Sequence, residues 1–410
     1  MRHNPLFKGV FIPDVEARVF SDGRAYFYGS RDKDNESWCS GEYLVFSTAD
    51  MRGIAAHGVS ITMEALKGCK GTRLFAPDCI ERGGKYYLYL CCNDESEWVA
   101  SGDTPMRFGN AVQIKNIIGI DPAVFVDDDG QAYYYWGQFE LNGAKLKDSM
   151  TELAEGSAVA GIVTQDTHFF HEGSSVRKRN GVYYLVFADV SRGDKTTPFG
   201  GTPTCLGYAT SVNPLGPFVY RGVIIDNASC DPKSWNNHGS IECIDGQWYV
   251  FYHRATCGNG HMRRACCEKI FFDGNGLIQE VPMTSSGAAE YIEAGKLDAE
   301  LFCSLSGACY LAADESPERL TNIHNGDTAI MRYIKLDSAN MFITVEGCGK
   351  GRITVTAKDM QNKTAVIADM IFSECGKAQK FPIKAFDGIC ELIFSFDSVA
   401  GLEIIAASFS

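Results

Sequence analysis

Three carboxylates of the 410-residue chain precede a turn glycine by the same number of residues. The spacing is nine positions in each of three pairs: Asp14 and Gly23, Asp121 and Gly130, Glu172 and Gly181. Two carboxyl groups that face each other across a pocket can divide proton transfer, one donating a proton and the other taking one from water. These residues therefore indicate general acid–base chemistry, provided that the fold brings them together.

The glycines belong to a unit that occurs five times. A turn containing glycine leads into an aromatic-rich run at residues 22–30, 83–91, 129–137, 180–188 and 245–253. Asp-Gly or Asn-Gly between β-type runs indicates a hairpin. The turn glycines are 46 to 65 residues apart, which is enough for four short strands. Five such units predict an all-β chain with a five-bladed β-propeller. Five matching hairpins disfavour the alternative, a β-sandwich.

The predicted propeller would gather the three carboxylates in one place. Equivalent positions on successive blades surround one axis, so the side chains before each innermost strand converge on the mouth of the channel. Carboxylates crowded there repel one another, which costs stability unless the arrangement has a use. His238 precedes Gly246 by eight residues and is expected to join them. Asp78 precedes Gly84 by only six, and we expect it to anchor a turn or a hydrogen bond.

Hydrolysis of a glycosidic bond requires two carboxyl groups that face each other across a pocket. One carboxylic acid protonates the leaving oxygen, and a carboxylate activates water or attacks directly. The chain has no G-x-S-x-G motif and no phosphate-binding loop, which disfavours acyl and phosphoryl transfer. His168 and His171 flank Glu172 and are interpreted as structural.

Four further side chains are candidates for binding a sugar. Trp38 and Trp98 lie in predicted loops and are expected to stack on a sugar ring. Packing between blades is the alternative for Trp38. Phe170, two residues before the third carboxylate, is expected to form an apolar wall beside it. Arg264 is expected to point back at the pocket and bind hydroxyl groups, with the adjacent Arg263 as the alternative.

Composition excludes some classes of partner. The net charge of −13 leaves no basic excess for nucleic acid or an anionic membrane. No apolar stretch is long enough for a membrane helix, and the N-terminus lacks the layout of a signal peptide. Several of the sixteen cysteines are adjacent or lie in apolar strands. We therefore expect free thiols and a cytoplasmic location.

A change of composition after Met283 indicates a second domain. We predict a propeller over residues 1–284, a linker over 285–300 and a small antiparallel β-sandwich over 301–410. The last region contains six strand-like runs and none of the five tryptophans.

Segments of the predicted propeller resemble glycoside hydrolase family 43. The matching segments are 74–90, 118–137, the HEG at 171–173, 235–254 and 262–281, and the resemblance covers about residues 4–284. It implies a five-bladed propeller and hydrolysis with inversion. By the resemblance Asp14 is the general base, Asp121 the pKa modulator and Glu172 the general acid, while His238 coordinates a calcium ion directly or through water.

The resemblance also has departures. Valine follows Asp14 where the family usually has proline, and the acid motif reads EGS instead of EGP at residues 172–174. The C-terminal region resembles a carbohydrate-binding module of family 6 but lacks the tryptophans with which such modules often bind sugars. It is expected either to bind sugar or to buttress the propeller.

The sequence thus predicts an exo-acting α-L-arabinofuranosidase that acts on arabinoxylan or its oligosaccharides. β-Xylosidase is the close alternative, because the two sugars present similar hydroxyl groups. A glycan-binding propeller without catalysis would lack one of the three carboxylates, and all three are present. The related retaining fructan hydrolases have a W-M-N-D-P motif where this chain reads FIPDVEA.

Overall fold

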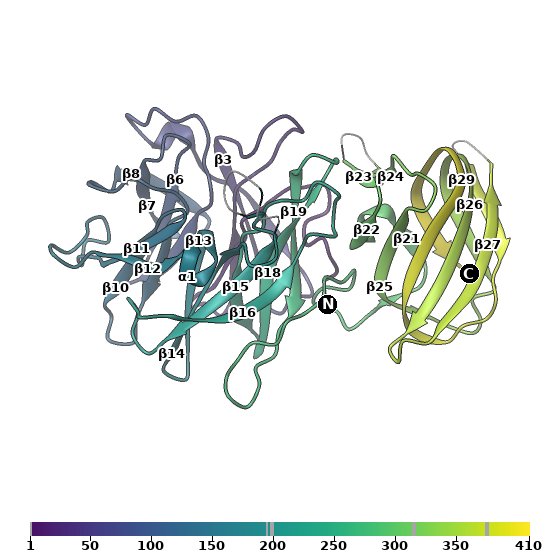
Figure 1. Ribbon diagram of the computed structural model, residues 1–410. Coiled ribbons are helices and arrows are strands. Elements are labelled where there is room, and N and C mark those ends of the chain that lie inside the picture. The colour runs from purple at the N-terminus through teal and green to yellow at the C-terminus, as the bar shows by residue number, and fades with distance from the viewer. Residues whose placement is uncertain (1, 194–195, 197–200, 314–316, 374–376) are drawn as a thin grey trace.

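The computed structural model describes residues 2–193, 196, 201–313, 317–373 and 377–410. Its first domain is a propeller in which every predicted hairpin forms the first two strands of a sheet (Figure 1). The innermost strands are β1 (Glu16–Val19), β5 (Asp78–Arg82), β9 (Ala123–Val126), β13 (Phe170–Arg179) and β17 (Ser240–Ile244). The second strands are β2 (Ala25–Tyr28), β6 (Lys85–Cys91), β10 (Ala132–Trp136), β14 (Val182–Asp189) and β18 (Gln247–Thr256). The fold class predicted from the sequence is therefore confirmed.

Outer strands complete the five blades. The third strands are β3 (Glu42–Thr48), β7 (Glu97–Thr104), β11 (Glu140–Lys145), β15 (Cys205–Ser211) and β19 (His261–Lys269). The fourth strands are β4 (Ala55–Thr62), β8 (Arg107–Gln113), β12 (Val159–Thr164) and β16 (Val219–Asp226). The short helices are η1 (Met63–Ala65) and α1 (Gln165–His168). The fifth sheet has three strands, and the segment that follows β19 adds no fourth strand but forms an isolated bridge between Phe272 and Ile278.

The N-terminal segment closes the ring of blades. The main-chain N–H of Leu6 donates to the carbonyl of Ala265 in β19 at 2.8 Å, and Asn4 donates to the carbonyl of Cys267 at 3.0 Å. The five innermost strands each contact the next, with β17 returning to β1. The first and last blades of the propeller are thereby held together.

Buried ion pairs fill the channel between the innermost strands. Arg18 donates to both carboxylate oxygens of Asp78, at 2.9 and 2.5 Å, and to the carbonyl of Val124 at 2.7 Å. Arg177 reaches Glu16 from β13 at 2.6 Å. Asp78 thus anchors neighbouring blades, as its different spacing predicted.

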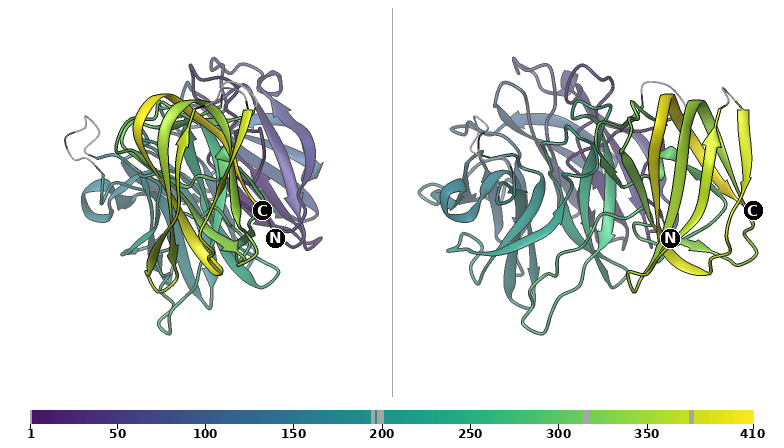
Figure 2. Two further views of the ribbon diagram at one scale, coloured as in Figure 1. Left: turned by 90° about the vertical axis from the view of Figure 1, so that its right-hand side faces the viewer. Right: turned by 45° about the vertical axis from the view of Figure 1, so that its right-hand side comes forward.

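The second domain consists of two packed layers with a hydrophobic core between them (Figure 2). Its elements are β20 (Ile292–Glu293), β21 (Lys296–Asp298), η2 (Ala299–Leu301), β22 (Ser304–Ser306), β23 (Tyr310–Ala312), β24 (Arg319–Thr321), β25 (Thr328–Leu336), β26 (Phe342–Asp359), β27 (Thr364–Phe372), β28 (Lys377–Pro382) and β29 (Gly388–Phe409). The first half of β26 pairs with β28 and its second half with β27, while β29 runs beside both halves. These two long strands therefore belong to both layers.

Short strands occupy part of the region expected to be a linker. β20 pairs with β25, and β21 pairs with β29, so the second domain begins before residue 301. Strands of two and three residues carry too little alternation to be recognised in the sequence. No helix in the described part of the chain is long and apolar enough to span a membrane.

The two domains make direct contact. The main-chain N–H of Cys257, just after β18, donates to the carbonyl of Leu311 in β23 at 2.8 Å. The guanidinium of Arg264 forms a buried ion pair with the carboxylate of Glu318. The second domain therefore packs against the fifth blade.

Candidate active site

The blades present the predicted groups to one cavity of about 500 Å³. Its lining includes Asp14, Asp121, Glu172, His238, Trp38 and Trp235. The two aspartates stand two residues before their innermost strands in the left-handed backbone region, with φ values of 58° and 57°. Non-glycine residues rarely adopt this conformation, and where they do the site commonly has a function. The repeat has thus brought the three carboxylates together.

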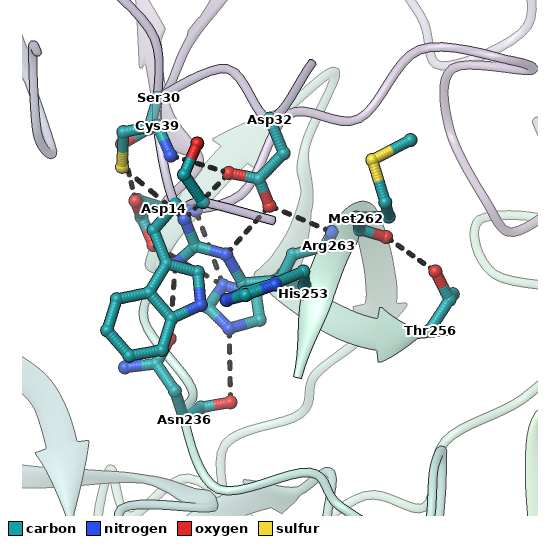
Figure 3. A network of polar contacts seen from close by, with 12 residues as sticks. Asp14, Ser30, Asp32, Cys39, Asn236, His253, Thr256, Met262 and Arg263 are labelled. Atoms are coloured by element: carbon teal, nitrogen blue, oxygen red, sulfur yellow. Dashed lines mark hydrogen bonds and ion pairs between the residues drawn. The ribbon is translucent and has the colours of Figure 1, made fainter. Parts of the chain in front are cut away.

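Asp14 is buried and held by donors on both oxygens (Figure 3). The hydroxyl of Ser30 donates to Oδ2 at 2.5 Å, and Nη1 of Arg263 lies 3.3 Å from Oδ1. Burial raises the pKa of Asp14, but Arg263, His253 and His238 outweigh it and hold this pKa well below its usual range. Asp14 is therefore ionised at neutral pH, as a general base must be.

Arg263 is itself locked by Asp32. Its Nε and Nη2 donate to the two oxygens of Asp32, both at 3.0 Å, and its main-chain N–H donates to the same carboxylate at 3.0 Å. A guanidinium held in this bidentate way keeps a fixed plane. Its remaining nitrogen, Nη1, is thereby aimed at Asp14.

Glu172 enters the cavity from β13, and each of its oxygens accepts one amide donor. Nδ2 of Asn236 donates to Oε1 at 2.9 Å, and Nε2 of Gln138 donates to Oε2 at 2.7 Å. Nε2 of His171 lies 3.9 Å from Oε2. The carboxyl group is thus positioned by two neutral donors from different blades.

Asp121 and His238 share the space with these two carboxyl groups. Nδ1 of His238 lies 3.7 Å from Oδ2 of Asp121 and 3.9 Å from Oδ1 of Asp14. Burial raises the pKa of Asp121 well above its usual range, and the charges of Glu172 and Asp14 raise it further. Burial lowers the pKa of His238, so the ring is neutral at pH 7. The site therefore contains an ionised base and a carboxyl group that resists ionisation.

A family model for glycosyl hydrolases family 43 matches residues 3–278. The chain belongs to this family. It is therefore a glycoside hydrolase, and the three carboxylates and the propeller are the features by which the sequence resembled that family. The family hydrolyses with inversion, which requires a base and an acid and no covalent intermediate.

Three proteins of known name or structure are similar to this chain. A protein of Thermoclostridium stercorarium named xylosidase/arabinosidase is 28% identical over an alignment of 471 positions, which covers 96% of each chain. A family 43 β-xylosidase/α-arabinofuranosidase from a compost metagenome, solved with xylotriose in a calcium-free form, gives a TM-score of 0.59 at 28% identity and covers 69% of this chain and 98% of its own. An arabinoxylan arabinofuranohydrolase from Bacillus subtilis, solved with cellotetraose, has the same fold over 100% of this chain and 97% of its own, with a TM-score of 0.58 at 22% identity.

The surroundings of His238 do not form a calcium cage. Calcium takes six to eight oxygen ligands at about 2.3–2.6 Å. In the described part of the chain, the carboxylates within 4 Å of Nδ1 are those of Asp14 and Asp121, and the first is already paired with Arg263. These side chains do not fit a calcium ion bound by His238. In the described ranges, the group with the ligand spacing of a metal site lies elsewhere, at Cys69, Cys92 and Asp94.

Three predicted binding residues lie outside the cavity. Trp98 is buried between the first two blades, where Nε1 donates to the hydroxyl of Ser96 at 2.9 Å. Phe170 is fully buried and packs on Phe187, with ring centroids 5.5 Å apart. Arg264 faces the second domain, because successive residues of a strand point to opposite faces. The cation at the site is therefore the alternative, Arg263.

Trp38 does line the cavity and forms an aromatic wall with Trp235, which the sequence did not single out. Their ring centroids are 4.6 Å apart at an interplanar angle of 57°, and His261 meets Trp38 edge-on at 5.3 Å. Trp38 thus faces the pocket and contacts Trp235 from the loop before the fifth blade, while its stacking on a sugar stays a prediction. Asn236 and Gln138 were also missed, although Asn236 stands only two residues before His238.

Proposed function

We propose that this glycoside hydrolase removes α-L-arabinofuranosyl units from arabinoxylan or its oligosaccharides, with Asp14 as base and Glu172 as acid. One observation carries the proposal. A carboxylate held ionised by Arg263 and a second carboxyl group held by two amides line the same cavity from different blades. Asp121 is proposed to tune this pair through its charge and to position the substrate.

The mechanism follows from this division of roles. Asp14 takes a proton from a water molecule, whose oxygen forms a bond to the anomeric carbon. The bond from that carbon to the leaving oxygen breaks, and the leaving oxygen receives the proton of Glu172. Inversion requires the two carboxyl groups to be roughly 6.5–9.5 Å apart, which leaves room for the water.

The proposed sugar specificity rests on the aromatic wall formed by Trp38 and Trp235 and on the activities for which the relatives are named. Trp38 and Trp235 give the cavity an aromatic side on which a pentose or its neighbour can stack. The relatives that carry names act, by those names, on xylosides and arabinosides. β-Xylosidase is therefore the second candidate, and short plant oligosaccharides are the proposed substrates in both cases. A cytoplasmic location stays a prediction from the sequence.

The test compares two substrates side by side. We expect the protein to release nitrophenol from the α-L-arabinofuranoside faster than from the β-D-xyloside, and Asp14→Ala to lose at least about 100-fold in kcat/KM. Preference for the xyloside would establish the second candidate. NMR of the first product formed should show the inverted anomer. Binding of oligosaccharides without turnover of either glycoside would support the non-catalytic propeller instead.

A further inference from the structure

The two oxygens of Glu172 are held in different ways. Oε1 accepts from Asn236 and Oε2 accepts from Gln138, and both donors are side-chain amides. A proton that Glu172 delivers must sit on one of these oxygens, so the neighbours decide which oxygen is available. The difference between the two amides therefore indicates which oxygen of Glu172 delivers the proton.

Asn236 cannot turn its amide over. Its Oδ1 faces Nη1 of Arg263 at 3.4 Å, and a guanidinium only donates. The amide nitrogen must therefore point to Glu172. Its main chain is fixed as well, because the carbonyl oxygen accepts from Nε2 of His253 at 3.0 Å and from Nδ2 of Asn227 at 2.9 Å. Oε1 of Glu172 thus has a permanent donor opposite it.

Gln138 is free to move by comparison. Its side chain is exposed at the rim of the cavity, and in the described part of the chain its amide makes one hydrogen bond, to Oε2 of Glu172. No charged group fixes which end of the amide faces the carboxyl. A rotated amide would accept a hydrogen bond from protonated Oε2, and the oxygen of a leaving group would take the place of this amide when substrate binds.

We infer that Asn236 is the positioning residue of the general acid: it anchors Oε1 of Glu172 and leaves Oε2 as the oxygen that carries and delivers the proton, with Gln138 standing where the leaving group binds. This inference rests on the proposed acid role of Glu172. In this arrangement Gln138 contacts the leaving group. The hydrogen bond from Asn236 to Glu172 sets the distance over which the proton is transferred to the leaving oxygen.

The same residue also ties the acid to the base. Asn236 reaches Asp14 through Arg263, whose Nη1 is 3.4 Å from Asn236 and 3.3 Å from Asp14. A second path runs through His253, whose Nε2 donates to the Asn236 carbonyl while Nδ1 accepts from the main-chain N–H of Asp14 at 3.4 Å. Asn236 therefore fixes where the acid lies relative to the base, which is the separation that inversion requires.

Leaving-group dependence separates the two amides. Protonation by the acid matters for an oligosaccharide and little for a nitrophenyl glycoside, whose leaving group needs no proton. We expect Asn236→Ala to lose about 100-fold in kcat on the oligosaccharide and less than about 3-fold on the nitrophenyl glycoside of the same sugar. The retained nitrophenyl activity also shows that the variant is folded. Gln138→Ala leaves the Asn236 anchor of Oε1 in place, so its loss on the oligosaccharide should be much smaller than that of Asn236→Ala.

Equal losses on both substrates for Asn236→Ala, or a loss on the oligosaccharide in Gln138→Ala as large as that in Asn236→Ala, would overturn the inference. A crystal structure of each variant gives a readout that does not depend on the sugar. The Glu172 carboxyl should leave its position in Asn236→Ala and keep it in Gln138→Ala. If the proteins hydrolyse neither pentoside, the proposed specificity fails, and these structures still decide the role of Asn236: an unmoved Glu172 in Asn236→Ala refutes it.

Discussion

A Cβ atom on Gly173 would lie 2.6 Å from Nε2 of His238, closer than two such atoms approach in folded proteins. The backbone at Gly173 also has a φ of 60°, which disfavours any side chain. In the structure the missing side chain makes room for the imidazole of His238.

Gly173→Ala is expected to displace His238 and, with it, the adjacent Glu172. A misplacement of about 1 Å costs about 100-fold in rate, so kcat/KM on an oligosaccharide, whose leaving oxygen needs the proton of Glu172, should fall by about that factor. Gly181→Ala is the matched control. It lies in the turn of the same hairpin with a φ of 79° and open space around the Cβ position, so it should lower stability by about 1 kcal/mol and leave activity intact. Equal activity of the two variants would contradict the packing argument.

Arg263 and Arg264 offer a matched pair on one strand. Arg263 is the group that does most to lower the pKa of Asp14, so Arg263→Gln should raise that pKa. Protonation of the base then begins at higher pH, and the acidic limb of the kcat/KM profile should move toward neutral pH. Arg263→Lys keeps the charge and should move the limb less, although it loses the bidentate contact with Asp32.

Arg264→Gln tests the other face of the strand. It removes the partner of Glu318 and leaves a partly buried carboxylate unpaired, which costs less than the roughly 3–5 kcal/mol of a fully buried pair. We expect a lower melting temperature with kcat/KM within about 3-fold of the original. A shifted pH profile in Arg264→Gln, or an unshifted one in Arg263→Gln, would indicate that Arg264 is the cation that acts on Asp14.

Much of the site followed from the sequence because turn chemistry and strand period are local. Gly23, Gly130 and Gly181 mark hairpins, and blade symmetry then places the residues nine positions earlier around one axis. The side-chain partners were not local. Asn236 meets Glu172 across 64 residues, and no pattern within one blade reports such a contact. Whether Arg263 or Arg264 faces the pocket depends on strand register, which composition does not give.

The second domain shows a different limit. The sequence indicates separate strands at residues 340–347 and 351–359, because Gly347, Gly349 and Gly351 interrupt the alternation. In the structure they belong to one strand, β26, and its pairing shifts register at this glycine-rich stretch. Glycine in a strand marks a bulge or a bend as often as an end. Only the partner strands decide between these.

The donor set around His238 leads to a prediction about metal. Because its neighbours supply two carboxylates and one of them is paired with Arg263, we expect added calcium or a chelator to leave the melting temperature and kcat/KM unchanged. Thermal unfolding and turnover after treatment with EDTA, then with excess calcium, would measure this. A calcium-dependent rise in melting temperature that His238→Ala abolishes would restore the site implied by the family resemblance.

The buried carboxyl group of Glu97 makes the stability of the protein depend on pH. This carboxyl group is fully buried in β7, where the hydroxyl of Tyr134 donates to Oε2 while Oε1 has no hydrogen-bond partner among the described residues. Burial raises the pKa of Glu97 to about 8. A carboxyl whose pKa is raised by folding stabilises the protein fully below its unfolded pKa, and this contribution is lost as the pH rises through about 8.

Glu97→Gln mimics the protonated form and keeps an acceptor for Tyr134. The original protein should lose about 3 kcal/mol of unfolding free energy between pH 6 and pH 9 through this group, and the variant should not. Urea unfolding at the two pH values measures the difference. Glu95→Gln, exposed in the preceding turn, removes the same charge and should keep the original pH dependence. If Glu97→Gln kept it too, Glu97 would be ionised in the folded state and paired in a way that these contacts do not provide.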